Sequence, residues 1–378
     1  MVDERPLRRR CPWGFLGMLG AVIVVETFVA RHRPEFTDTA SLTWVMSGKA
    51  AAIKAPGREI LCAGDSLAKH GLLPRVIAGR TGRPTYNLAA AGASAPTTYF
   101  LLKRAIESGA RPSAVVVDFM PNLQAGRPQY QLRAWQEFLS PREWLDLASV
   151  DRDPSFIAAT AVGALIPSVR ARNEVRTSIL SALRGKIDPL PEENGVNLRN
   201  WDLNLGANLA ARNLSFSGEV GPEVHKALMS DVWATHRVNT TYIRRILEMT
   251  AKHNIAVFWL IPPTSPAHLA RRVQSGTDAK HTQFVQSMQA AYPHVVVVDG
   301  RGSGYGSDLF VDAIHLDGRG ATTLSTDVAA ILNDRLTRGS FREDRWIKLP
   351  RYRDQPFGTP MEDVEQSRVA WKGERARR

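Results

Sequence analysis

The 378-residue sequence is poor in cysteine and lacks the regular ligand spacings of common metal- and nucleotide-binding proteins. Its two cysteines are Cys11, beside an apolar segment, and Cys62, inside a predicted strand, so we expect no disulfide. The nine histidines show no spacing such as H-x-x-x-H, which argues against a metal site. We therefore expect neither a metal nor a cofactor, and a core that is stable without covalent cross-links.

Basic residues outnumber acidic ones, but they do not form a nucleic-acid-binding pattern. Lys and Arg total 49 and Asp and Glu total 37, which gives a formal net charge of +12. Much of the basic charge lies at the two ends, in Arg8–Arg10 and in residues 338–378. No basic helix is interleaved with aromatic residues and no zinc-finger spacing occurs, so we expect no nucleic-acid partner. The 44% of hydrophobic and 23% of charged residues are typical of a globular chain.

One segment, Trp13 to Ala30, is apolar over almost its whole length and contains a single charge, Glu26. About 20 apolar residues are needed to span a bilayer, so this segment is just long enough. The arginines at positions 8–10 favour a cytoplasmic N-terminus. We predict that residues 1–33 form a basic tip and a single transmembrane anchor, with the domain that follows, and any site in it, outside the cytoplasm. A cleaved signal peptide and a buried core helix are the alternatives.

Short apolar runs alternate with helical patterns over most of the chain. The runs predict five strands, at Glu59–Ala63, Tyr86–Leu88, Ala114–Val117, Ile255–Ile261 and Val295–Val298. Strands that alternate with helices are typical of a parallel sheet covered on both faces. We therefore predict an α/β fold over residues 34–337, namely a flavodoxin-like three-layer α/β/α sandwich that binds its ligands at the carboxyl ends of the strands.

The alternation is interrupted between about residues 121 and 233, which we interpret as a helical insertion over the sheet edge and over the face where the strands end and ligands would bind. We expect the insertion to bury four large side chains, Trp135, Phe138, Trp144 and Leu145. The polar stretch 197–213 is predicted to be a loop. Residues 338–378 contain three prolines and mixed charges, and predict a basic tail that is extended or disordered.

The first candidate motif is Gly64-Asp65-Ser66-Leu67, which follows the first predicted strand and begins a helix. A helix N-terminus presents backbone N–H groups that have no partner within the helix. Such groups stabilise negative charge, so Ser66 is placed where a nucleophile and an oxyanion could both be supported. The same residues would also serve as an ordinary helix N-cap.

The second candidate motif is Asp312-Ala313-Ile314-His315, which follows the last strand and precedes the closing helix. A serine hydroxyl needs a base, and a carboxylate can orient that base and stabilise its cation. Both motifs follow carboxyl ends of strands in the same predicted sheet, so we expect Ser66, Asp312 and His315 to converge. His70 lies one helical turn after Ser66, and we interpret it as a packed or solvated helix residue.

On these residues the chain resembles the SGNH, or GDSL, family of serine hydrolases. Gly64-Asp65-Ser66 matches the first block of that family, and Asp312 with His315 matches its Asp-x-x-His block. The resemblance covers roughly residues 57–122 and 238–336. It implies an SGNH hydrolase-like fold, a triad of Ser66, Asp312 and His315, and hydrolysis through an acyl-enzyme.

The resemblance also implies two further oxyanion donors. Gly92, at the end of Asn87-Leu88-Ala89-Ala90-Ala91-Gly92, matches the glycine of the second block. The third block usually reads Gly-x-Asn-Asp, whereas this chain has Asp118-Phe119-Met120-Pro121-Asn122. Asn122 is the candidate donor there, at a displaced spacing.

Together these patterns predict a membrane-bound esterase. Its substrate would be an acylated small molecule or an acylated carbohydrate of the envelope or extracellular space. One alternative is an O-acyltransferase that passes the acyl group to a sugar hydroxyl. The other is a non-catalytic envelope protein that keeps the SGNH fold, an alternative motivated by the unusual third block.

Overall fold

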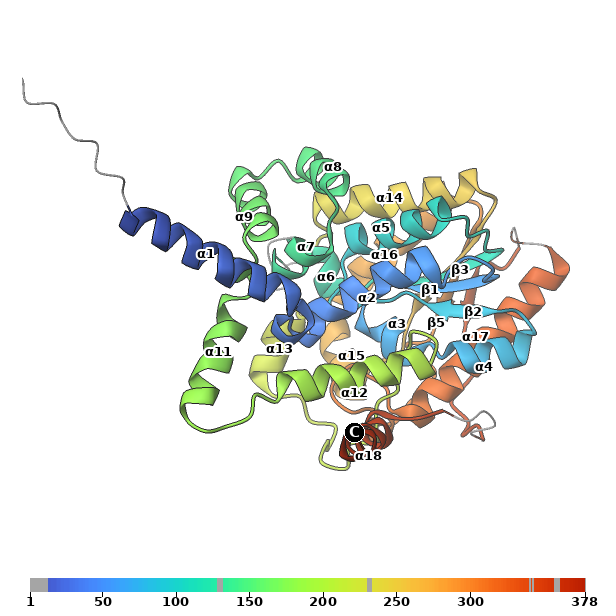
Figure 1. Ribbon diagram of the computed structural model, residues 1–378. Coiled ribbons are helices and arrows are strands. Elements are labelled where there is room, and N and C mark those ends of the chain that lie inside the picture. The colour runs from blue at the N-terminus through green and yellow to red at the C-terminus, as the bar shows by residue number, and fades with distance from the viewer. Residues whose placement is uncertain are drawn as a thin grey trace, which may run out of the picture.

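Six parallel strands form the centre of the computed structural model, which describes residues 13–127, 132–229, 233–339, 341, 343–356 and 361–377. In these residues the strand order is β2-β1-β3-β4-β5-β6 (Figure 1). The strands are β1 (Ile60–Ala63), β2 (Thr85–Asn87), β3 (Ala114–Asp118), β4 (Ala256–Ile261), β5 (Val295–Asp299) and β6 (Trp346–Lys348). The predicted α/β class and parallel sheet are confirmed, and the five predicted strands are joined by a sixth at one edge.

The strands are continuous apolar runs because both faces of the sheet are buried. Successive side chains of a strand point to opposite faces, so each strand contributes to two separate cores. Leu61, Val117 and Trp259 lie in the core on one face. Cys62 and Phe258 lie in the core on the other face.

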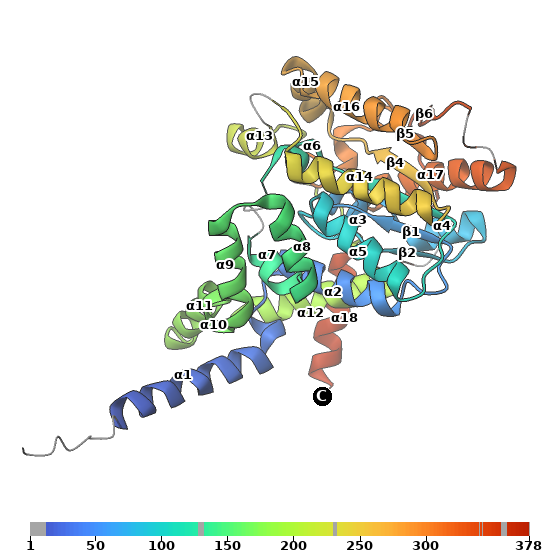
Figure 2. The ribbon, with the colours of Figure 1, turned by 90° about the horizontal axis from the view of Figure 1, so that it is seen from above.

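Helices cover both faces of the sheet (Figure 2). The first core is covered by α2 (Thr39–Ile53), α5 (Ala95–Glu107), α14 (Arg237–Lys252) and α16 (Thr277–Ala291). The second core is covered by α3 (Ser66–Gly71), α4 (Pro74–Thr81) and α17 (Gly318–Arg338). Both α3 and α17 therefore lie against the same face, and each begins after a loop at the carboxyl ends of the strands.

Residues 121–233 contain a succession of helices. They are α6 (Pro121–Ala125), α7 (Leu132–Phe138), α8 (Pro141–Asp151), α9 (Pro154–Leu165), α10 (Pro167–Arg170), α11 (Arg172–Leu183), α12 (Leu190–Leu203) and α13 (Pro222–Leu228). Trp135 and Phe138 are buried, and their rings pack edge-on against Trp44 of α2. Leu145 is 60% exposed, so its predicted burial is wrong, because α8 turns Glu143 and Leu147 inward instead.

Two further predictions are wrong at the C-terminal side of the chain. Residues 197–203 are not a loop but the last turns of α12, which packs against α18 (Val364–Ala376). Residues 338–378 are not extended throughout, because β6 pairs with β5 and α18 is a regular helix. Asn200 of α12 and Asn204, the residue that caps its C-terminus, both donate to the Glu362 carbonyl, at 2.7 and 2.9 Å. These long-range contacts order both segments, and local composition does not reveal them.

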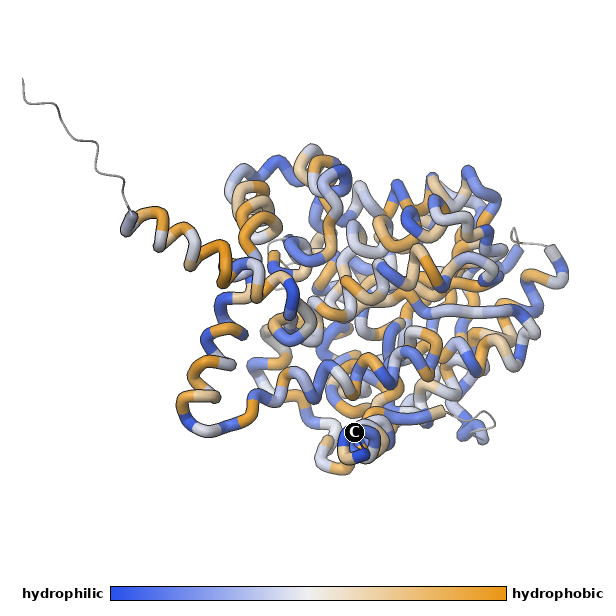
Figure 3. The backbone as a smooth tube through the Cα atoms, viewed as in Figure 1, coloured by the Kyte–Doolittle hydropathy of each residue, from blue (hydrophilic) through white to orange (hydrophobic). Residues whose placement is uncertain are grey.

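The N-terminal helix α1 (Trp13–Arg31) projects from the body of the protein, followed by the short helix η1 (Arg33–Phe36). Figure 3 shows α1 as a mostly hydrophobic rod, and most of its side chains are exposed. It is long and apolar enough to cross a membrane, as predicted. Cys11 and the arginines at positions 8–10 lie outside the described residues.

Candidate active site

Ser66 is the first residue of α3, directly after the turn that ends β1. Asp65 is the N-cap, and its Oδ1 accepts the Leu67 N–H at 2.8 Å. The turn depends on Gly64, whose φ is +141°. A Cβ atom at Gly64 would lie 1.7 Å from Oδ1 of Asp118, so no larger residue fits there without rearrangement. This local geometry fixes the Ser66 backbone at the end of the strand.

Asp312 and His315 lie in a closed loop before α17. The loop is bounded by a bridge between Phe310 and Leu316, and Asp312 accepts the N–H groups of Ile314 and His315 at 2.9 Å each. Oδ2 of Asp312 lies 2.7 Å from Nδ1 of His315. The carboxylate therefore holds both the loop backbone and the imidazole ring.

The structure brings the three predicted triad residues together. His315 Nε2 lies 2.8 Å from Ser66 Oγ, although the two residues are 249 positions apart in the chain. Ser66, His315 and Asp312 therefore form one continuous series of hydrogen bonds. Partial burial alone would raise the pKa of Asp312, but its hydrogen bonds from His315 and from the loop N–H groups lower it to about 2. Asp312 is thus an anion beside the imidazole at neutral pH.

His70 packs against the triad histidine, which agrees with its interpretation as a packed helix residue. The centroids of the His70 and His315 rings lie 4.9 Å apart, with the rings tilted by 55°. Burial and the neighbouring His315 lower the pKa of His70 to about 3. His70 is therefore neutral at neutral pH and supports the His315 ring without competing for a proton.

Gly92 lies in a loop that is tied to the Ser66 turn. The Ala90 N–H donates to the Gly64 carbonyl at 3.1 Å. Ala90 lies two residues before Gly92, and Gly64 lies two residues before Ser66. Gly92 has a φ of +66°, in the left-handed region that glycine adopts most readily. The predicted second block therefore adjoins the first block through its backbone.

Two side chains of α2 hold the Gly92 loop from its other side. Thr43 Oγ1 accepts the Ala91 N–H at 2.9 Å, and the Trp44 indole donates to the Ala91 carbonyl at 2.7 Å. Both polar groups of the Ala91 backbone are therefore fixed by α2. The sequence motifs do not indicate this role, because α2 precedes the first block and contains no recognisable pattern of its own.

Asn122 lies in α6 (Pro121–Ala125), and its side-chain amide contacts the end of α13. Its Nδ2 donates to the Ala227 carbonyl at 3.4 Å, at the end of α13. Within the described part of the chain, no hydrogen bond joins Asn122 to Ser66 or to His315. The structure therefore does not link Asn122 to the Ser66 series.

Two buried carboxyl groups, those of Asp65 and Asp118, lie next to Ser66 and belong to none of the predicted catalytic positions. The Asp65 N–H donates to Asp118 Oδ1 at 3.0 Å, and the Met120 N–H donates to Asp65 Oδ2 at 2.8 Å. Burial, and then the nearby Asp65, raise the pKa of Asp118 well above its usual value. The sequence does show that Asp118 ends an apolar strand, and such a position is normally buried.

A small apolar cluster is buried beside the residues of the Ser66–His315–Asp312 series. Leu67, Met120, Ala313 and Ile314 form a small buried cluster of their own, separate from the two main cores. Leu67 follows Ser66, and Met120 donates its N–H to Asp65. Ala313 and Ile314 lie between Asp312 and His315. An apolar group bound at Ser66 would lie beside these side chains.

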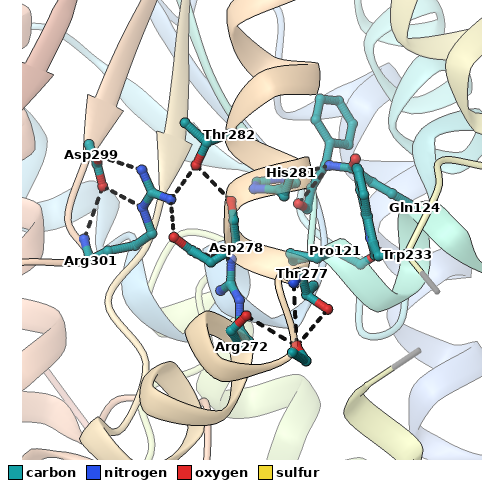
Figure 4. Close-up of polar contacts among 12 residues, drawn as sticks. Pro121, Gln124, Trp233, Arg272, Thr277, Asp278, His281, Thr282, Asp299 and Arg301 are labelled. Carbon is teal, nitrogen blue, oxygen red and sulfur yellow. Dashed lines mark hydrogen bonds and ion pairs between the residues drawn. The ribbon is translucent and has the colours of Figure 1, made fainter. Parts of the chain in front are cut away.

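A second polar cluster lies at the carboxyl end of β5 (Figure 4). Asp278 of α16 binds Arg272 of α15 (Pro266–Gln274) at 2.9 Å and Arg301 at 2.7 Å. Arg301 also binds Asp299, the last residue of β5, at 2.7 Å. These contacts link α15 and α16 to the sheet. Among the described residues, no group of three or more His, Cys, Asp or Glu side chains could hold a metal ion.

No protein-family model matches the chain, and no curated protein sequence matches it. The fold and the contacts around Ser66 therefore carry the functional assignment.

Proposed function

We propose that this chain is an SGNH-type serine hydrolase that cleaves ester bonds through an acyl-enzyme. The observation that carries the proposal is the hydrogen-bonded series Ser66–His315–Asp312. The order β2-β1-β3-β4-β5 also supports it, because flavodoxin-like sheets bind ligands where the strand order reverses, between β1 and β3. Ser66 follows β1 at that position.

The geometry supports the usual division of labour in a catalytic triad. Ser66 Oγ attacks the ester carbonyl while His315 Nε2 takes the hydroxyl proton. Asp312 keeps the Nδ1 proton on His315 in place and stabilises the imidazolium that forms. His315 then gives its proton to the leaving alcohol, which leaves an acyl group on Ser66. In the second half, His315 deprotonates a water molecule that hydrolyses the acyl-enzyme.

The oxyanion would be stabilised by backbone N–H groups. The Ser66 N–H lies in the first turn of α3, where helix geometry provides no internal acceptor. The loop that carries Gly92 supplies the second donor. This is supported by the hydrogen bond from the loop to the Gly64 carbonyl and by the two hydrogen bonds between the loop and α2. The side chain of Asn122 is not assigned a role here, since its amide donates to Ala227.

The proposed substrate and its location are inferred from helix α1 and from the residues beside Ser66. With α1 as a single transmembrane anchor, the hydrolase domain would face the extracytoplasmic side. An acylated carbohydrate of the envelope or extracellular space, or an acylated small molecule, would then be within reach. The buried apolar cluster of Leu67, Met120, Ala313 and Ile314 lies beside Ser66 and would favour an apolar acyl group there.

A fluorophosphonate probe tests the proposal, because it labels a serine only where a neighbouring base activates the hydroxyl. We expect the full-length protein to be labelled, Ser66→Ala to remain unlabelled and Ser149→Ala, in exposed α8, to behave as the wild type. Absence of label on a folded wild-type chain would instead support the non-catalytic alternative.

Hydrolysis and acyl transfer are separated by a second measurement. The unlabelled protein is supplied with an activated acyl ester, and the amount of free acid that it releases is compared with the amount of acylated product formed from an added sugar. We expect free acid to dominate, because His315 and Asp312 are partly open to water, with 20% and 51% of their side chains exposed. Predominant sugar acylation would identify an O-acyltransferase.

A further inference from the structure

Helices α9 to α11 expose an unusual number of large apolar side chains. Leu165 is 81% exposed, Leu183 is 79% exposed and Ile187, just beyond α11, is 94% exposed. Val162, Val169 and Ile179 on the same three helices are also exposed. We refer to these six residues as the α9–α11 apolar face. Soluble surfaces rarely gather so much apolar area without a partner.

This face is joined directly to the membrane-length helix α1. The Ser168 N–H of α10 donates to the Glu26 carboxylate at 2.9 Å, and the Ser168 hydroxyl binds the other oxygen of Glu26. Helix α1 packs against α10, and Figures 1 and 2 both show α9 and α11 beside the base of α1. The contact also satisfies the one charged side chain within the apolar part of α1.

The position of Glu26 along α1 sets the depth of the contact. Glu26 precedes the end of α1 at Arg31 by five residues, which corresponds to about 7.5 Å of helix. Helices that lie in a membrane interface bury their apolar faces about 5–10 Å below the headgroup boundary. If α1 crosses a bilayer, its bond to Ser168 therefore holds α10 at interfacial depth.

The charges beside the apolar face suit the same location. Arg172, Arg176, Arg184 and Lys186 are exposed on α11 and just after it. Apolar residues next to such cations are typical of segments that lie on anionic membranes, where each Lys or Arg near the surface contributes about 1 kcal/mol. A lipid surface satisfies both the apolar and the basic groups.

We infer that α9–α11 form a second membrane contact, which lies in the headgroup layer of the bilayer that α1 crosses. The inference rests on the proposed anchoring by α1 and does not depend on the esterase chemistry. Figure 2 shows α9, α10 and α11 on the side of the molecule from which α1 projects, so one bilayer could meet both α1 and these helices.

Spin labels in the full-length protein test the inference. The chain carries Cys11→Ser, while buried Cys62 is retained, and it is reconstituted in vesicles of phosphatidylcholine and phosphatidylglycerol. Single labels replace Leu165, Leu183 and Ile187. Matched labels replace Leu145 and Ile53, exposed apolar residues of α8 and α2. A label at Val22 reports on α1.

Collisions with oxygen, which concentrates in lipid, and with a neutral nickel complex, which stays in water, identify each environment. We expect collisions with oxygen to dominate for the labels at positions 165, 183, 187 and 22, and collisions with the nickel complex to dominate for the labels at positions 145 and 53. Nickel at 165, 183 and 187 with oxygen at 22 would overturn the second contact and leave the anchor intact. Nickel at 22 would overturn both, and low access to both reagents at the three sites would indicate a protein partner instead of lipid.

The same vesicles keep this test separate from the esterase proposal. Fluorophosphonate labelling of Ser66 is recorded on each spin-labelled variant. Labelled Ser66 with nickel-accessible α9–α11 would overturn the membrane contact alone. Oxygen-accessible α9–α11 without labelling of Ser66 would overturn the esterase proposal alone.

Discussion

Asp118 accepts the N–H of Asp65 at 3.0 Å, so the end of β3 is hydrogen-bonded to the residue that precedes Ser66. Asp65 in turn accepts the Met120 N–H at 2.8 Å. These reciprocal bonds fix the two strand ends relative to each other. Both carboxyl groups are fully buried, which accounts for the raised pKa of each. Burial therefore favours the neutral form of each carboxyl group.

The first prediction concerns Asp118→Asn and Asp118→Ala. An amide has the shape of a protonated carboxyl, so Asp118→Asn should change the free energy of unfolding by less than about 1 kcal/mol. Asp118→Ala leaves the buried Asp65 N–H without its acceptor and should cost about 2 kcal/mol. Urea unfolding compares the two variants. Equal losses in both would show that Asp118 is ionised in the folded protein.

The same pair predicts a pH dependence. A carboxyl whose pKa is raised on folding binds its proton more tightly in the folded state. Its contribution to the free energy of unfolding therefore falls as the pH rises above the unfolded value near 3.8. Urea unfolding of wild type and Asp118→Asn should be compared from pH 4 to pH 8. As the pH rises, the free energy of unfolding of the variant should increase relative to that of the wild type. A constant difference between them would contradict the raised pKa.

A further prediction concerns Asp312→Asn. The amide cannot stabilise the imidazolium of His315, so the acylation rate should fall on the order of 10³- to 10⁴-fold, measured with an activated ester at neutral pH. Because the pKa of Asp312 is about 2, its contribution to stability is present above pH 3.8 and is lost as the pH falls toward 2. A nearly unchanged rate in Asp312→Asn would remove Asp312 from the triad.

Thr43→Val tests the support of the Gly92 loop. The substitution keeps the shape of the side chain but leaves the Ala91 N–H without its acceptor. We expect a loss of about 1–3 kcal/mol in stability and a fall in acylation rate of up to roughly a hundred-fold, since the proposed oxyanion donor lies in that loop. Thr241→Val, on the exposed side of α14, is the control and should change neither value. A stability loss at full rate would limit Thr43 to a structural role.

Asp278→Asn tests the charged cluster at the end of β5. The variant weakens the bonds to both Arg272 and Arg301, whose side chains are only 4% and 12% exposed. Breaking a buried ion pair should lower the free energy of unfolding by about 3 kcal/mol. Asp334→Asn, whose partner Arg338 is 72% exposed, should cost less than about 0.5 kcal/mol. Fluorophosphonate labelling of Ser66 should persist in both folded variants, and its loss in Asp278→Asn would assign the cluster to the site.

The position of the site was predictable because parallel strands end at one edge of a sheet. Ser66 after β1 and His315 before α17 could be placed together from the order of strands and loops alone. The contacts of Thr43, Trp44 and Asp118 were not predictable, since each links segments distant in sequence through a single backbone group. The same reason explains the error at α18, where Asn200 and Asn204 bind a carbonyl more than 150 residues away.

Strands β3 and β4 are neighbours in the sheet, with Asp118 opposite Leu260, yet α6 to α13 intervene between them in the chain. The long excursion leaves the sheet and returns to the adjacent strand. Such an excursion costs little in chain entropy, because the cost of closing a loop grows only slowly with its length. Ser66, Asp312 and His315 lie outside the excursion. Trp135 and Phe138 lie within it and pack against Trp44, whose indole holds the Ala91 carbonyl, so a change in the inserted helices would reach the Ser66 region through α2.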